Sequence, residues 1–161
     1  MKKIKPILLT MLMLFTFLAT PNCADAAVGG ETVTYLDDGG YIVTTIIEEP
    51  STKRPGIQPY TTTVEMTRSK ISRYYNGDGD VMWYIKVTGT FTYNGTTSKC
   101  LKSSVTAESL NKNWKVSELS AARSGATALA SCKAKQYLAN IYIGSMDGFV
   151  TLTCDRNGNL S

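Results

Sequence analysis

Residues 81–93 read Val-Met-Trp-Tyr-Ile-Lys-Val-Thr-Gly-Thr-Phe-Thr-Tyr, and this stretch decides the fold. Apolar and polar side chains alternate along it, with Val81, Trp83, Ile85, Val87, Phe91 and Tyr93 in one phase and Lys86, Thr88, Thr90 and Thr92 in the other. A period of two is typical of a β-strand with one buried face and one solvated face. The pattern therefore predicts a long strand whose Trp83 points into the core.

Turn sequences flank this strand on both sides. Asn76-Gly77-Asp78-Gly79-Asp80 precedes it and Asn94-Gly95 follows it. Such Asn-Gly and Asp-Gly clusters are strong hairpin signals, so we expect antiparallel neighbours at about residues 62–75 and 96–105.

Further strands are predicted on both sides of this meander. Residues 32–36 and 41–47 form a hairpin through an Asp-Gly turn, and residues 113–119 and 148–154 also read as strands. Residues 126–138 place Ala or Cys at alternate positions, which favours a strand, although Ala also gives a helix of about three turns as the alternative. Residues 49–59 contain three prolines and are expected to be a loop or crossover.

About eight strands without a convincing helix predict an all-β fold. We expect a single antiparallel two-sheet sandwich over residues 27–161, with a small barrel as the alternative. Cys100, Trp114 and Cys154 follow one another as in an immunoglobulin domain, but Leu152 stands in the tyrosine-corner position. The sandwich is therefore immunoglobulin-like in outline and not of standard immunoglobulin topology.

The N-terminus has the regions of a signal peptide. Three lysines precede an apolar run at residues 7–19, and Ala24-Asp25-Ala26 then supplies small residues for cleavage after Ala26. The alternatives are an uncleaved anchor and a lipoprotein modified at Cys23, whose preceding Pro21-Asn22 fits that processing poorly. We expect a signal peptide at residues 1–26, a secreted, extracellular domain, and no stable membrane insertion after signal removal.

Charge and composition exclude several classes of function. Removing residues 1–26 takes away three of 17 basic and one of 13 acidic residues, which leaves a net charge of +2 without a Lys/Arg block, so no nucleic-acid partner is expected. The chain has no histidine, so Cys-His and Ser-His-Asp catalysis are excluded.

Two weaker motifs do not restore a catalytic or metal site. Ser109 and Lys112 have a Ser-x-x-Lys spacing without the accompanying motifs, and Asn76, Asp78 and Asp80 read as a polar turn, with a weak calcium site as the alternative. We expect neither a cofactor nor an enzyme.

Aromatic side chains supply the candidate ligand patch. Tyr84 lies on the wet face of its strand, opposite in phase to Trp83, and Tyr74 or Tyr75 is expected beside it across the hairpin. We therefore predict a non-catalytic protein that acts through surface contacts at the cell envelope or in the extracellular environment. The alternative is a glycan-binding module that uses Tyr74, Tyr75 and Tyr84.

Three strand-like strings resemble a group of small exported proteins of Gram-positive, clostridia-like bacteria, a domain of unknown function: residues 41–46, 87–95 and 150–154. The resemblance implies a secreted β domain in which Cys100 and Cys154 match recurring cysteines, and it carries over no activity. Loop entropy differs too little among the three cysteine pairings to choose one. Cys154 shares the apolar phase of its strand and the resemblance supplies Cys100, so we predict a Cys100–Cys154 disulfide with Cys132 free and buried among alanines.

Overall fold

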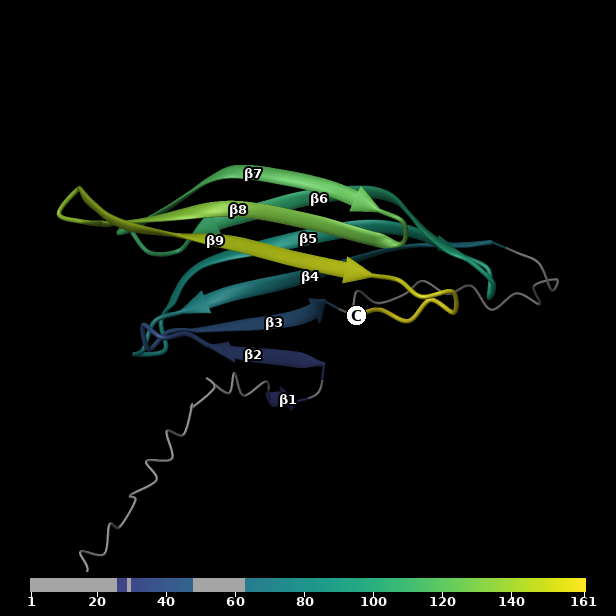
Figure 1. Cartoon of the computed structure of the whole chain (residues 1–161), viewed down its shortest axis with the longest axis horizontal. Helices are drawn as coiled ribbons and strands as arrows, with labels where there is room; N and C mark the ends of the chain where they lie inside the picture. Colours follow the sequence, from purple (N-terminus) through teal and green to yellow (C-terminus); the bar gives the residue numbers. More distant parts are fainter. Residues whose placement is uncertain (1–25, 29, 48–62) are drawn as a thin grey trace, which may run out of the picture.

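The computed structural model describes residues 26–28, 30–47 and 63–161, which form two packed antiparallel sheets (Figure 1). The strands are β1 (Ala26–Val28), β2 (Glu31–Tyr35), β3 (Tyr41–Ile47), β4 (Val64–Tyr75), β5 (Val81–Tyr93), β6 (Ser98–Ser109), β7 (Trp114–Ser124), β8 (Thr127–Leu138) and β9 (Ile141–Thr153). The predicted Pro-rich loop at 49–59, and the predicted signal peptide except for Ala26, lie outside the described residues.

Within each sheet, every strand pairs with its neighbours along the chain, whereas β6 and β7 belong to different sheets. One sheet has the order β1-β2-β3-β4-β5-β6 and the other the order β7-β8-β9. Two consecutive meanders packed face to face confirm the predicted two-sheet sandwich and exclude the barrel. This connectivity also differs from the Greek key of an immunoglobulin domain.

The core lies where β8 and β9 cross β5, and the predicted phase of β5 is confirmed. Trp83, Ile85, Val87 and Phe91 are at most 1% exposed and face the second sheet. Opposite them, β8 buries only small side chains, namely Ala128, Ala130, Cys132 and Ala134. Small residues on one sheet make room for the large rings of the other, and Thr127–Leu138 form strand β8 and not the alternative helix.

Gly89 shows how closely the two sheets approach. It falls in the buried phase of β5, and a Cβ atom there would lie 2.5 Å from the ring of Phe91 and 2.9 Å from the Cβ of Ala128. A side chain at this position would therefore displace the Phe91 ring or push β8 away.

Four turns gather at one end of the sandwich, at the left of Figure 1: β2–β3, β4–β5, β6–β7 and β8–β9. The β6–β7 turn carries the chain from one sheet to the other, and the amides of Leu110 and Asn111 donate to the Met82 carbonyl. Side chains from two of these connections, β4–β5 and β6–β7, meet between the sheets at this end.

Candidate functional site

A pocket of about 220 Å³ opens between the sheets at this end, and we call it the end pocket. It is lined by residues of β4, β5, β7 and β8 and of the β4–β5 and β6–β7 turns: Tyr74, Asn76, Met82, Asn111, Asn113, Trp114 and Gln136. Drug-sized ligands occupy roughly 300–1,000 Å³, so the end pocket has room for one ring or one side chain of a ligand.

Aromatic rings form the inner side of the end pocket. The Tyr74 ring lies 5.4 Å from the Trp114 ring and 5.8 Å from the Trp83 ring, and the two indoles are 6.5 Å apart. The Tyr74 hydroxyl donates to Oδ2 of Asp38 over 3.0 Å. Burial, helped by this hydrogen bond and by the Asp38 charge, raises the pKa of Tyr74 to about 12. The phenol therefore stays protonated at physiological pH.

Four carboxamides form the outer side of the end pocket. Oδ1 of Asn76 accepts the amides of Asp78 and Asp80, and Oδ1 of Asn111 accepts the amide of Asn113, so these two oxygens hold their own turns together. In the described part of the chain, the side chains of Asn113 and Gln136 have no hydrogen-bond partner. Both are half-buried, and both offer a free donor and a free acceptor to a ligand.

The chemistry of the end pocket is neutral. Of the described residues that line it, none carries a charged side chain. Carboxamides that donate and accept, next to indole and phenol rings, match a polyhydroxylated group with apolar C–H faces better than they match an ion.

The three tyrosines of the predicted patch do not share one surface. Tyr74 is 5% exposed and belongs to the core, whereas Tyr75, the next residue, points to the outer face of the first sheet. Successive residues of a strand point to opposite faces, so Tyr74 and Tyr75 could not both accompany Tyr84. Tyr74 is therefore not part of an exposed patch and lines the end pocket instead.

The outer face of the first sheet carries a row of tyrosines that the sequence did not reveal. Tyr41 stacks on Tyr75 with centroids 4.9 Å apart and an interplanar angle of 1°, and Tyr35 follows at 5.9 Å from Tyr41. The Tyr84 hydroxyl donates to Glu108 over 3.1 Å. Because the stacked rings of Tyr41 and Tyr75 cover each other's faces, this row is no flat platform for a sugar.

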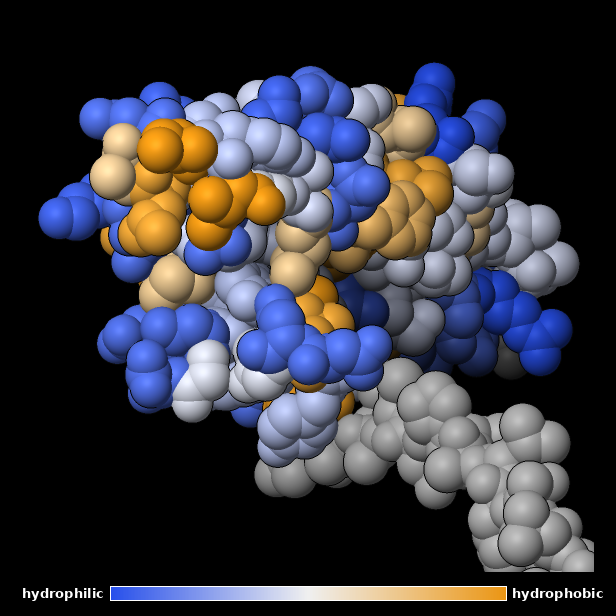
Figure 2. All heavy atoms as spheres, turned by 60° about the vertical axis from the view of Figure 1, so that its left-hand side comes forward, coloured by the Kyte–Doolittle hydropathy of each residue, from blue (hydrophilic) through white to orange (hydrophobic). Residues whose placement is uncertain are grey.

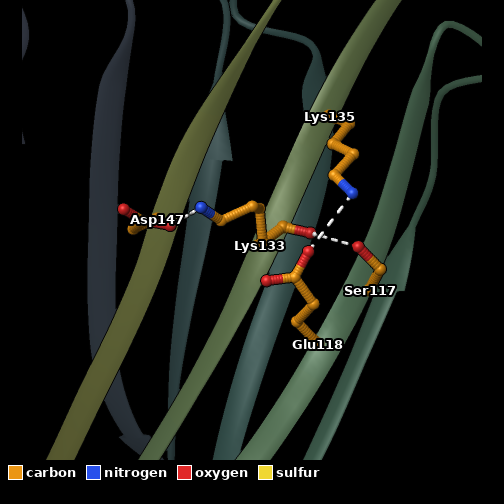
Figure 3. A network of polar contacts seen from close by, with 5 residues as sticks. All are labelled: Ser117, Glu118, Lys133, Lys135 and Asp147. Atoms are coloured by element: carbon orange, nitrogen blue, oxygen red, sulfur yellow. Dashed lines mark hydrogen bonds and ion pairs between the residues drawn. The ribbon is translucent and has the colours of Figure 1, made fainter.

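The outer face of the second sheet carries a polar network (Figure 3). Nζ of Lys133 lies 3.3 Å from Asp147, and Nζ of Lys135 lies 3.2 Å from Glu118. Beside them is a shallow depression of about 280 Å³ that also includes Cys132 and Phe149. Burial raises the pKa of the Cys132 thiol to about 11, so it is protonated and poorly nucleophilic at neutral pH.

Cys100, Cys132 and Cys154 are free and buried in the structure, so the predicted Cys100–Cys154 disulfide is not formed there. The placement of Cys132 among buried alanines is confirmed. The amide of Cys100 donates to the Gly125 carbonyl and the amide of Cys154 donates to the adjacent Ala126 carbonyl. The β7–β8 turn thus holds both cysteines, and their pairing under oxidation stays a prediction.

The weaker sequence motifs have structural roles. The Ser109 hydroxyl donates to the carbonyls of Asn111 and Trp114, which commits it to the β6–β7 turn and away from Lys112. Asn76 closes the β4–β5 turn with its side-chain oxygen. Within the described ranges there is no group of three or more Cys, Asp or Glu that could hold a metal ion, and no helix long and apolar enough to cross a membrane.

The end pocket itself was not predicted from the sequence. In the sequence, Trp114 stands out only by its spacing from the cysteines, and isolated amides such as Asn113 and Gln136 carry no motif. No family model matches the chain, and no curated protein or solved structure is significantly similar to it.

Proposed function

We propose that this protein is secreted, is not an enzyme, and acts through surface contacts at the cell envelope, with the end pocket binding one sugar ring of a neutral glycan. The observation that carries the proposal is the pair of unpartnered carboxamides of Asn113 and Gln136 beside the ring of Trp114. Half-buried amides without partners are the groups that a ligand's hydroxyls satisfy.

Sugar chemistry fits this lining in two ways. Ring hydroxyls donate to and accept from carboxamides, and sugar C–H groups can contact the part of the largely buried Trp114 ring that lines the end pocket. The volume of about 220 Å³ admits a single ring. A ligand of this size at the open end of the sandwich would be a terminal residue or a branch of a longer glycan, with the rest of the chain in solvent.

The same lining supports binding over catalysis. General acid–base chemistry needs a group that exchanges a proton near the working pH. Among the described residues that line the end pocket, Tyr74 is the only titratable one, and its pKa of about 12 keeps it protonated. Its hydroxyl is also committed to Asp38.

A glycan and cell-wall binding array on the exported protein tests the proposal. We expect saturable binding of a neutral glycan that falls at least tenfold in an Asn113→Ala, Gln136→Ala double variant, since each hydrogen bond contributes about 0.5–1.5 kcal/mol. The matched control is Asn157→Ala, which removes an exposed carboxamide in the C-terminal turn.

Two outcomes would contradict the proposal. Binding that is lost in Tyr84→Ala but kept in the double variant would place the ligand on the outer face of the first sheet. Turnover of any glycan would make the protein an enzyme.

A further inference from the structure

Large apolar side chains are exposed around the β8–β9 turn, at the same end of the molecule as the end pocket. Leu138, Ile141, Tyr142 and Ile143 are 62%, 69%, 55% and 53% exposed, and we call these four residues the hairpin tip. Ala139 and Asn140 form the turn between them, both with positive φ. Figure 2 brings this end of the molecule forward and shows hydrophobic side chains gathered on its surface.

The shape of the hairpin tip limits what can cover it. Ile141, Tyr142 and Ile143 are consecutive in β9, and consecutive residues of a strand point to opposite faces, so both faces of the hairpin are apolar and exposed. The hairpin also projects past the neighbouring turns at this end (Figure 1). A protein groove covers one face of a ribbon, whereas the hydrocarbon of a lipid layer surrounds a projecting turn on all sides.

Directly behind the hairpin tip lie one tyrosine, Tyr137, and two lysines, Lys112 and Lys115. The rings of Tyr137 and Tyr142 meet edge to face at 6.0 Å, and Nζ of Lys115 lies 4.9 Å from the Tyr137 ring centroid. The carbonyl of Asn113 accepts the amide of Tyr137, which places the neighbouring Lys112 beside the base of the hairpin. Tyrosine at the headgroup level with lysine next to it is the arrangement that proteins use at the boundary of a bilayer.

On the second sheet, the charges around the hairpin tip favour an anionic surface. Glu118 is the only acidic residue between Ser109 and Met146, and it is paired with Lys135, while Asp147 is paired with Lys133. Lys112 and Lys115 have no acidic partner among the described residues and remain to attract anionic headgroups. The aspartates of the β2–β3 and β4–β5 turns lie on the first sheet, so an anionic bilayer would hold the domain tilted with the second sheet toward it.

We propose that the hairpin tip docks this protein reversibly on an anionic lipid bilayer, with Leu138, Ile141 and Ile143 in the headgroup–acyl boundary and Lys112 and Lys115 on the headgroups. Such contact is peripheral and reaches about 5–10 Å into the layer without spanning it. It does not depend on a ligand in the end pocket.

Co-sedimentation of the exported protein with phosphatidylglycerol-containing vesicles tests the proposal, after mass spectrometry has shown that the apolar leader is absent. We expect binding that weakens with added salt and on pure phosphatidylcholine vesicles. Leu138→Ser with Ile141→Ser should weaken it at least tenfold, because two apolar side chains no longer leave water. Lys112→Gln with Lys115→Gln should also weaken it, by about fivefold or more.

The matched control is Phe149→Ser, which removes an equally exposed apolar side chain of β9 eight residues from Ile141 and should leave vesicle binding unchanged. Thermal unfolding checks that each variant is folded. Absence of binding at low salt, or an equal loss in the Phe149 variant, would overturn the proposal. A concentration-dependent dimer that disappears with the Leu138 and Ile141 substitutions would also overturn it, because the occupant would then be a second copy of the chain.

Discussion

Gly148 of β9 lies directly against the indole of Trp83 on β5: a Cβ atom at residue 148 would stand 2.9 Å from a ring carbon of Trp83 and 2.7 Å from Sγ of Cys132. Trp83 is 1% exposed, so its ring has no free space to move into. The missing side chain of one strand thus makes the space for the largest side chain of the facing strand.

Gly148→Ala should therefore destabilise the fold by about 1–3 kcal/mol, because the added methyl overpacks a full core. Gly144→Ala is the control, since a Cβ atom there has nothing within 4 Å. Urea denaturation of both variants measures the difference in the free energy of unfolding. Equal stabilities of the two variants would show that Trp83 does not pack on residue 148.

Trp83→Ala tests which face of β5 points into the core. Loss of a buried indole should reduce the free energy of unfolding by about 3–5 kcal/mol. Tyr84→Ala, one residue away on the outer face, should cost much less, because it removes a half-exposed ring and an exposed hydrogen bond to Glu108. If denaturant titrations showed that Tyr84→Ala lowers the free energy of unfolding more than Trp83→Ala does, β5 would present its other face to the core.

Stability should fall at alkaline pH because of Tyr74. Its pKa is raised from 10.0 to about 12 in the folded protein, chiefly by burial and further by Asp38. The folded state holds the proton more tightly, so this contribution, about 3 kcal/mol, is complete below pH 10 and is lost as the pH rises through 12. Thermal melts between pH 8 and 12 should show this loss in the natural protein and a smaller one in Tyr74→Phe. If the melting temperature fell equally with pH in the natural protein and in Tyr74→Phe, the loss of stability would come from other titratable groups.

Oxidation should join Cys100 to Cys154. The amides of Cys100 and Cys154 donate to the carbonyls of Gly125 and Ala126, which are adjacent in the chain. Burial raises the pKa of the Cys154 thiol, and the charge of Cys100 is a further cause of this rise. Non-reducing peptide mapping of the protein after air oxidation should find this pair bridged, with Cys132 free. The bridge should add about 4 kcal/mol to the free energy of unfolding by closing a long loop. A bridge that includes Cys132 would refute the pairing.

Most of the strands could be predicted from sequence because their signals are local. The alternation in β5 and the Asn-Gly and Asp-Gly turns beside it depend only on residues close in the chain, and the structure gives β5 the predicted bounds, Val81–Tyr93. The alternate small residues at 126–138 likewise predicted β8 over a helix. Backbone geometry sets a period of two whatever the strand packs against, so these features do not depend on the rest of the fold.

The tertiary structure alone decided where side chains from different turns meet. Tyr74 and Tyr75 are neighbours in sequence, yet one lines the end pocket and the other stacks on Tyr41 outside, because the choice depends on which face of β4 the second sheet covers. Asn113 and Gln136 come together only because β7 and β8 pair with Trp114 opposite Gln136. Contacts between residues far apart in the chain exist only after both sheets have formed, so no local pattern in the sequence encodes them.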